Sequence, residues 1–256
     1  MMRTVDINSD IGESFGSWAI GDDVDNELMT VISSANIATG FHAGDPNIMR
    51  KTVESARKNG VAIGAHPGFN DLQGFGRRHF AIPAEELVND IIYQLGALRE
   101  FARLYEMPLQ HIKPHGALYM HLARDEVAAQ QFVTALHRLD AGLYLYCMSG
   151  SAVWHAAQRL EHPVITEFYA DREYDDQGFI VFTRKTGKLS VQAIVDKVLL
   201  ACLEGKVKTV TDNIIPIRFD SICIHSDTPG ALNIISAVKS ALIHAGVKVC
   251  SPGVAK

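Results

Sequence analysis

The sequence predicts a single α/β domain built as a parallel barrel. About seven short strand-like segments alternate with amphipathic helical patterns, an order typical of repeated βα units. Clusters of histidine, aspartate and lysine follow the strands rather than precede them. This places them at the carboxyl ends of the strands, where parallel α/β folds carry their functional sites. A chain of 256 residues is a normal length for one such barrel.

The strands are indicated by apolar or alternating segments that end abruptly at a polar cluster, a glycine or a proline. The first alternates apolar and polar residues and breaks at Gly12. The segment that ends at Ile112 leads into Lys113, Pro114 and His115, where the proline prevents a helix from running through the lysine and the histidine. We expect strands at residues 5–8, 34–40, 61–65, up to 112, 143–147, 164–169 and 221–224, and a terminal strand at 247–249.

Helices are expected between these strands, from the spacing of apolar residues and from the residues at their ends. Pro46 lies in a first turn, and Asn59 and Gly60 tolerate the left-handed conformation that ends a helix. The predicted helices cover residues 22–32 with Asp22 or Asp23 as the cap, 46–58, 83–105, 116–139 with a break that is not placed, 151 onward, 190–204 and 229–245. Residues 69–82 form a long glycine-bearing loop, which suggests a lid or a substrate clamp.

Composition limits the classes of partner. The chain has 24 Lys and Arg against 29 Asp and Glu, and the basic residues are dispersed, so nucleic acid is not an expected partner. The first residues lack the apolar core of a signal peptide, and no apolar run has membrane-spanning length. We therefore expect a soluble cytoplasmic protein without a membrane partner. Cys147, Cys202, Cys223 and Cys250 are widely spaced in apolar surroundings, which predicts free buried thiols.

Histidines and carboxylates from separate strand ends form the candidate site. Converging imidazoles and carboxylates can bind a divalent cation, with Asp10, His42 and His66 as the tentative ligands, or they can share acid–base work. A single such histidine more often caps its own loop, and only the repetition at equivalent positions favours a shared site. There is no His-Glu-x-x-His spacing. The histidines that each follow a strand are His42, His66, His115 and His225, and the carboxylates from the same end include Asp10, Glu13, Asp45 and Asp227.

Cationic side chains add anion-binding capacity to the predicted site. A lysine in such a position is in general more often a structural residue that snorkels to solvent. The alternative is that the partly desolvated stem of Lys113 makes its ammonium group a useful anchor for an oxyanion or a phosphate. Of Arg77 and Arg78, one is expected to bind a carboxylate as a planar fork and the other to be solvated or paired locally. Asp171 and Arg172 belong to a group, with Glu167, that either forms a local ion pair or contributes to the site. The sequence has no phosphate-binding glycine loop, no Gly-x-Gly-x-x-Gly after its first strand and no convincing serine triad.

Taken together, these motifs resemble the LamB/YcsF family, also described as the A-type component of the prokaryotic ATP-dependent 5-oxoprolinase. The matching segments are residues 6–13, 35–46, 64–68, 74–78, 113–119, 170–172 and 225–227, with Ser226 at a position where glycine is usual. The resemblance implies a distorted TIM-like (β/α)7 barrel of the glycoside hydrolase and deacetylase type. It also implies ATP-driven opening of the lactam of 5-oxo-L-proline to L-glutamate, performed with two partner subunits that look like the halves of an allophanate-hydrolase-type protein.

A mechanism follows from this resemblance as a hypothesis. Phosphorylating the lactam oxygen would make a poor electrophile reactive; Lys113 and one of the two arginines would steady negative charge, and Asp10 with His42 or His66 would activate the nucleophile, directly or through a metal. The residues expected to be catalytic are Asp10, His42, His66, Lys113, His115 and Asp227, and those expected to bind substrate or phosphate are Asn8, Glu13, Asp45, Arg77, Arg78, Asp171 and His225.

Two other functions fit the same residues. One is a metal-dependent amidohydrolase or deacetylase that acts alone, which ATP dependence would distinguish from the first hypothesis. The other is a non-catalytic component that presents substrate to its partners, which a binding titration with 5-oxoproline and ATP, followed by a turnover assay with and without partners, would distinguish.

Overall fold

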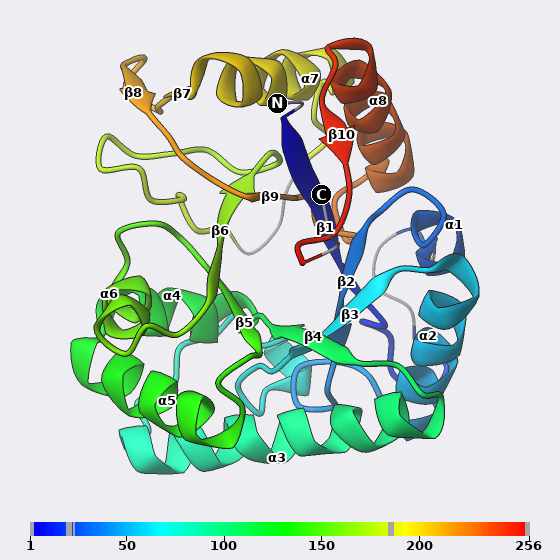
Figure 1. The fold of residues 1–256 in the computed structure, drawn as a ribbon, viewed down its shortest axis with the longest axis vertical. Coiled ribbons are helices and arrows are strands. Elements are labelled where there is room, and N and C mark those ends of the chain that lie inside the picture. The colour runs from blue at the N-terminus through cyan, green and yellow to red at the C-terminus, as the bar shows by residue number, and fades with distance from the viewer. Residues whose placement is uncertain (1–2, 19–21, 23, 184–186, 254–256) are drawn as a thin grey trace.

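Seven parallel strands close into a barrel in the computed structural model, which describes residues 3–18, 22, 24–183 and 187–253 (Figure 1). The ring closes because β1 pairs with β2 on one side and with β9 on the other, and β9 also pairs with β6. In order around the ring, the strands are β1 (Thr4–Ile11), β2 (Ser34–Ala38), β3 (Ala62–His66), β4 (Leu109–Ile112), β5 (Tyr144–Cys147), β6 (Val164–Tyr169) and β9 (Ser221–Cys223). The predicted (β/α)7 barrel is therefore confirmed.

Helices surround this ring, with α3 along one side and α7 and α8 along the opposite side (Figure 1). They are α1 (Asp25–Leu28), α2 (Pro46–Asn59), α3 (Ala84–Leu104), α4 (Gly116–Arg124), α5 (Glu126–Leu139), α6 (Ala152–Arg159), α7 (Val191–Leu199) and α8 (Ala231–His244). The break expected within residues 116–139 falls at Asp125, which ends α4 and caps α5 by accepting the amide of Ala128. Local capping chemistry thus separates two helices that apolar spacing alone leaves joined.

The prediction of a helix at residues 22–32 is wrong for most of that range. Only α1 is helical there, its N-cap is Val24, and Asp23 lies outside the described residues. Beyond α1 the amides of Thr30 and Val31 bond to carbonyls three residues back. The chain tightens in this way because Ser33 must bond to the backbone of β1 before β2 begins.

Three further segments lie outside the barrel. β10 (Lys248–Val249) pairs with the start of β1, which confirms the predicted terminal strand. β7 (Lys206–Lys208) and β8 (Ile214–Pro216) form an antiparallel ribbon that the sequence did not indicate. The helix predicted to end at residue 204 does so, but its last turn, Leu200–Glu204, is a π-helix. None of the helices in the described part of the chain is both long enough and apolar enough to cross a membrane.

The hydrophobic core lies between the barrel and the helices, whereas the inside of the barrel is polar. Asp6, Asn8 and Asp10 alternate along β1 and are buried. They bond to side chains from strands across the ring, such as Tyr146 of β5 and Glu167 of β6. The interior of a TIM-type barrel is commonly filled with branched apolar residues. Here the packed outer layer stabilises the fold, and the polar interior leads up to the carboxyl ends of the strands.

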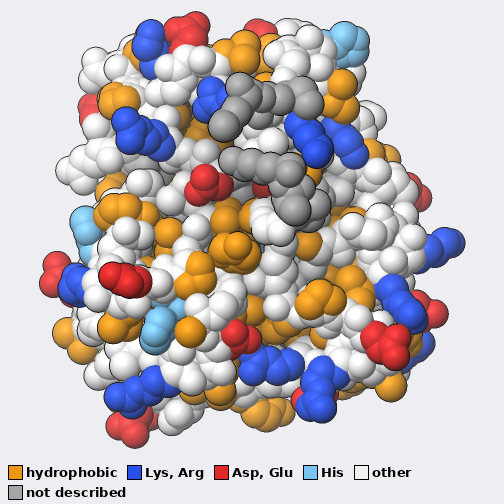
Figure 2. All heavy atoms as spheres, viewed as in Figure 1, with side chains coloured by type: hydrophobic (Ala, Val, Ile, Leu, Met, Phe, Trp, Pro, Cys, Tyr) orange, Lys and Arg blue, Asp and Glu red, His pale blue; other side chains and the backbone are white. Residues whose placement is uncertain are grey.

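The exposed surface carries dispersed charge. Figure 2 shows basic and acidic side chains interspersed over one face, so that neither sign gathers into a single patch there. The four cysteines are free, and Cys147, Cys202 and Cys223 are buried as expected, while Cys250 is partly exposed. Cys223, however, is not in purely apolar surroundings, because its sulfur contacts the ammonium group of Lys113.

Candidate active site

A buried lysine forms the centre of the barrel interior. Lys113 follows β4, and its Nζ donates to Asn8 Oδ1 at 3.1 Å, Asp10 Oδ1 at 3.2 Å and Cys223 Sγ at 3.0 Å. Nζ also lies 3.0 Å from Glu167 Oε1. Burial acts to lower the pKa of Lys113, but the two carboxylates and the polar sulfur hold it well above its usual value. The lysine is therefore a fixed positive charge that joins β1, β6 and β9.

The carboxylate of Asp10 is held between Lys113 and a histidine. Its Oδ1 accepts from Lys113 and, at 2.8 Å, from Asn36 Nδ2, and its Oδ2 lies 3.3 Å from His66 Nε2. Burial acts to raise the pKa of Asp10, and the neighbouring His66 and Lys113 outweigh this and hold it well below the usual value. Asp10 is thus an ionised carboxylate with one oxygen directed toward the histidines.

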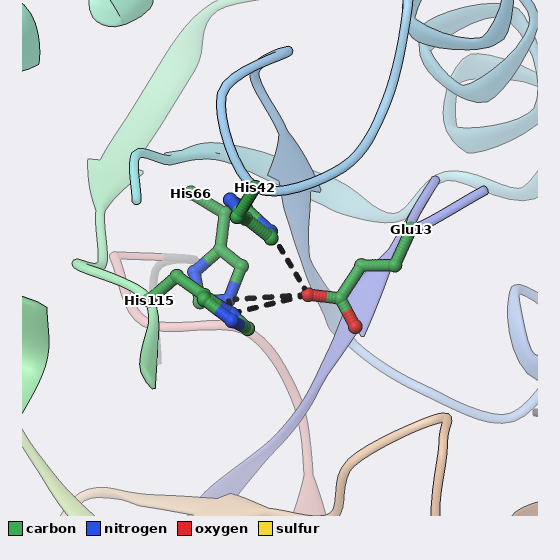
Figure 3. Close-up of side chains that lie close together, drawn as sticks. All are labelled: Glu13, His42, His66 and His115. Carbon is green, nitrogen blue, oxygen red and sulfur yellow. Dashed lines mark hydrogen bonds and ion pairs between the residues drawn. The ribbon is translucent and has the colours of Figure 1, made fainter. Parts of the chain in front are cut away.

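Three histidines converge on one carboxylate oxygen next to Asp10 (Figure 3). Glu13 follows β1, and its Oε1 is 3.1 Å from His42 Nε2, 3.2 Å from His115 Nδ1 and 3.7 Å from His66 Nε2. Each histidine belongs to a different βα connection: His42 follows β2, His66 ends β3 and His115 is the N-cap of α4. The rings of His42 and His115 stack with their centroids 3.7 Å apart. Barrel closure thus brings together residues that are up to 102 positions apart in the sequence.

Burial and hydrogen bonding set the charge of this cluster. Burial acts to raise the pKa of Glu13, but the neighbouring imidazoles of His115 and His42 lower it well below its usual value. Burial lowers the pKa of His42 to about 3 and also lowers the pKa of His115. An ionised glutamate therefore faces two imidazoles, those of His42 and His115, that favour the neutral form at neutral pH.

Glycines allow the loops to approach these rings closely. A Cβ on Gly76, whose φ is +60°, would lie 2.6 Å from His42 Cβ and 2.8 Å from His115 Cδ2. A Cβ on Gly68 would lie 2.6 Å from His42 Nδ1. The loop at residues 69–82, predicted as a lid or clamp, thus packs directly on the histidines, and the carbonyl of Phe75 accepts from His115 Nε2 at 2.8 Å.

A second group of charges lies at the barrel mouth. Asp171 accepts from His225 Nδ1 at 3.0 Å and from Thr228 Oγ1 at 2.6 Å, and it pairs with Arg172 Nη1 at 3.0 Å. His225 and Arg172 outweigh burial and lower the pKa of Asp171 well below its usual value. The mouth also contains a buried ion pair, with Arg77 Nη1 2.7 Å from Asp227 Oδ2.

A small cavity of about 30 Å³ lies among these groups. Larger hollows exist elsewhere on the surface, such as one of about 300 Å³ beside α1 and α2, but they include none of these groups. We take the small cavity as the candidate site because an ionised aspartate, a lysine and two arginines line it. It is lined by Asp10, His66, Arg77, Lys113, Pro114, His115, Gly116, Tyr119, Tyr169, Arg172, Ile180, Phe182, Thr183 and His225.

Two predicted site residues have other positions. Asp45 is the N-cap of α2, accepting from the amides of Asn47 and Ile48, and it also accepts from the amide of Gly16. Arg78 pairs with Asp71 inside the loop at residues 69–82, with nearly half of its side chain exposed. Neither residue lines the cavity. Of the two arginines, Arg77 is therefore the one that faces the cavity, and Arg78 is the one that is paired locally, within the loop.

Several residues of the network are not assigned to the site by the sequence. Glu167 was expected either to pair locally or to contribute, and it contacts Lys113 across the barrel. Cys223, Asn36 and His111 were not expected there; Asn36 Oδ1 accepts from His111 Nε2 at 2.8 Å. The signal that would have found them is a polar residue at every second position of a strand that is otherwise buried. Asp6, Asn8 and Asp10 show this pattern in β1.

The histidine cluster also has the donor set of a metal site. Glu13, His42, His66 and His115 each offer one ligand atom, and these four atoms lie within 4.8 Å of one another. Among the described residues, Glu13 Oε2 and His42 Nδ1 are buried without a hydrogen-bond partner. Imidazole nitrogens with a carboxylate suit a divalent transition metal. The tentative ligands His42 and His66 are in this group, while Asp10 lies beside it, against His66.

The fold and the site define a parallel (β/α)7 barrel protein with a polar, ionised interior and a metal-capable mouth. The chain belongs to the LamB/YcsF family, which matches residues 5–255. It is 63% identical over 251 residues to a Pseudomonas aeruginosa protein named as an A-type component of 5-oxoprolinase, covering 98% of this chain and 100% of that one.

Solved structures agree with this assignment. The crystal structure of a lactam utilization protein from Thermus thermophilus matches with a TM-score of 0.89 and 38% identity, covering 96% of this chain and 99% of that one. A putative cellobiose-phosphate cleavage protein from Enterococcus faecalis matches with a TM-score of 0.57 at 16% identity, covering 98% of each chain, which shows a shared fold alone.

Proposed function

We propose that this chain is the A-type component of a 5-oxoprolinase and that its barrel mouth is where the lactam ring of 5-oxo-L-proline is opened to L-glutamate. The observation that carries the proposal is the 63% identity over essentially the whole length of the Pseudomonas aeruginosa relative that bears this name. The site supports the same reaction class, because an ionised carboxylate, fixed cations and imidazoles meet at one cavity. These are the groups that hydrolysis of an amide requires.

Asp10 is the residue we assign to activating water, with His66 beside it. Asp10 Oδ2 faces His66 Nε2 at 3.3 Å, and both residues line the cavity. The other ring nitrogen of His66 donates to the carbonyl of Lys113 at 2.7 Å, which fixes the orientation of the ring. Lys113 holds Asp10 ionised, and its effect on the chemistry is therefore exerted through Asp10.

Arg77 is assigned to the negative charge that develops on the substrate. A lactam amide is a poor electrophile, and phosphorylation of its oxygen by ATP would supply a leaving group, so the reaction needs a cation near the oxygen. Arg77 reaches the cavity, is buried, and is paired with Asp227 at 2.7 Å. Its planar guanidinium can hold a carboxylate or phosphate while remaining charged.

ATP coupling and the two partner subunits, expected to resemble the halves of an allophanate-hydrolase-type protein, belong to the same proposal. The sequence of this chain has no phosphate-binding glycine loop. We therefore assign ATP binding to the assembled complex.

The test is ATP-dependent release of glutamate from 5-oxoproline, measured for this chain alone and together with the two partner subunits. We expect release only with all three components and ATP present. Release by the isolated chain without ATP would instead support a stand-alone amidohydrolase. If no combination releases glutamate, the proposed function is wrong.

A further inference from the structure

Two imidazole nitrogens of the histidine cluster face each other at short distance. His66 Nδ1 lies 2.7 Å from the carbonyl of Lys113, and His115 Nε2 lies 2.8 Å from the carbonyl of Phe75. A carbonyl oxygen only accepts, so both of these nitrogens carry the ring proton. In a neutral imidazole the other nitrogen is then a bare lone pair, and His66 Nε2 and His115 Nδ1 lie 3.0 Å apart. Two lone pairs at this distance repel unless a cation lies between them.

The carboxylate of Glu13 adds a third lone pair to the same space. Glu13 Oε1 is 3.2 Å from His115 Nδ1 and 3.7 Å from His66 Nε2. The two nitrogens are 3.0 Å apart, and the circle that passes through all three atoms therefore has a radius of about 1.9 Å. Bonds from zinc to such ligands are about 2.0–2.2 Å long, which is slightly more than this radius. An ion just outside the plane of the three atoms is therefore within bonding distance of all of them.

Two carboxylates lie against the same imidazoles. Glu13 Oε1 is 3.1–3.7 Å from three ring nitrogens, and Asp10 Oδ2 is 3.3 Å from His66 Nε2. Carboxylates buried this close together are costly unless cations lie near them, which favours binding of a cation here.

We propose that Glu13 Oε1, His66 Nε2 and His115 Nδ1 bind one divalent transition-metal ion, with the carbonyls of Lys113 and Phe75 fixing the tautomers of the two histidines. The third histidine, His42, places Glu13 through the 3.1 Å contact between its Nε2 and Oε1. Backbone carbonyls that fix ligating histidines are a regular feature of metal sites.

The proposed site is open on one side. His66 and His115 line the small cavity, together with Asp10 and Arg77. Sites that keep such an open position are catalytic rather than structural, and a metal there polarises a carbonyl oxygen or acidifies a water. Metal binding is measured without turnover, and its outcome is therefore independent of the proposed function.

The test uses the full chain, stripped with a chelator and titrated with Zn²⁺ by calorimetry and with Co²⁺ by visible absorption. We expect one tightly bound ion per chain. Glu13→Gln keeps the size of the side chain and removes its charge, and we expect binding at least about 100-fold weaker in this variant and in His115→Gln. His121→Gln is the matched control, because His121 Nδ1 and His79 Nε2 form an exposed pair 3.3 Å apart that offers a competing site. It should bind as the unchanged protein does.

Several outcomes would overturn the inference. Binding of no ion by the unchanged chain would mean that a proton on one of the two imidazoles fills the gap. Binding that survives Glu13→Gln but is lost in His121→Gln would place the ion on the surface pair. If the two site variants fail to fold, anomalous diffraction from crystals of the unchanged chain soaked in Zn²⁺ decides, since a peak must lie among Glu13, His66 and His115.

Discussion

Removing the buried ammonium of Lys113 should be among the most damaging single changes to this barrel. Lys113→Met keeps the length and apolar stem of the side chain but leaves Asp10 and Glu167 without the cation that lies 3.2 Å and 3.0 Å from them. Breaking a buried ion pair by removing one partner costs roughly 3–5 kcal/mol, because the remaining charge is uncompensated. We expect the free energy of unfolding to fall by about this amount.

The measurement is urea denaturation followed by circular dichroism at pH 7. Lys113→Met/Glu167→Gln removes one of the two orphaned carboxylates, and it should be more stable than the sum of the single changes predicts by about 0.5–3 kcal/mol. Lys58→Met is the control, since Lys58 is exposed at the end of α2 and its loss should change stability by no more than about 0.5 kcal/mol.

The same variants separate stability from chemistry. In the reconstituted complex, Lys113→Met should lower the rate of glutamate release at least about 100-fold, and the double variant should not recover it, because Asp10 remains without its cation. A Lys113→Met protein with the stability of the unchanged chain would refute the reasoning. It would mean that Asp10 and Glu167 do not depend on this lysine for their charge.

Three further outcomes follow from the mouth of the barrel. Arg77→Lys should lower kcat/KM for 5-oxoproline at least about tenfold, because an ammonium group lacks the planar fork, while Arg78→Lys should stay within about threefold; equal effects would contradict the assignment of Arg77. Asp171→Asn should lower kcat/KM about tenfold by releasing His225, and an unchanged value would show that this pair is structural only. Burial lowers the pKa of Lys197 to about 8, below the value of about 10.4 for free lysine. Between these pH values the unfolded chain binds more protons at this group than the folded chain does. The contribution of Lys197 to the free energy of unfolding therefore rises with pH. The free energy of unfolding of the unchanged chain minus that of Lys197→Met should therefore increase from pH 8 to pH 10, by at most about 1.4 kcal/mol per pH unit, in denaturation curves; a constant or falling difference would contradict this.

The fold was predictable because local signals and the barrel agree. Pro46 begins α2 and Gly60 ends it with a φ of +66°, where the sequence alone places these ends. The prediction of a helix at residues 22–32 failed because the length of α1 is set by tertiary contacts rather than by apolar spacing. Its first residue, Asp25, accepts the amide of Gly12 at 2.8 Å, and this tie to the loop after β1 is invisible in the local sequence.

The site was predictable as a set of strand ends but not as a network. Local sequence shows that His42, His66 and His115 follow strands, and barrel closure does the rest. It does not show which partner each residue meets across the ring. Glu167 reads equally well as the local partner of a neighbouring arginine, and only the packing of β6 against β9 and β1 directs it to Lys113.

The depth of an aspartate within the barrel decides whether its pKa is raised or lowered. Asp6 and Asp10 lie four positions apart on the same face of β1, and each is about 1% exposed. Asp6 accepts only from the hydroxyls of serines and Tyr146, and burial raises its pKa. Asp10 lies at the level that Lys113 reaches, and its pKa is lowered. Neutral hydrogen-bond donors at one end of the barrel and fixed charges at the other therefore direct the ionised groups toward the mouth, where a substrate can enter.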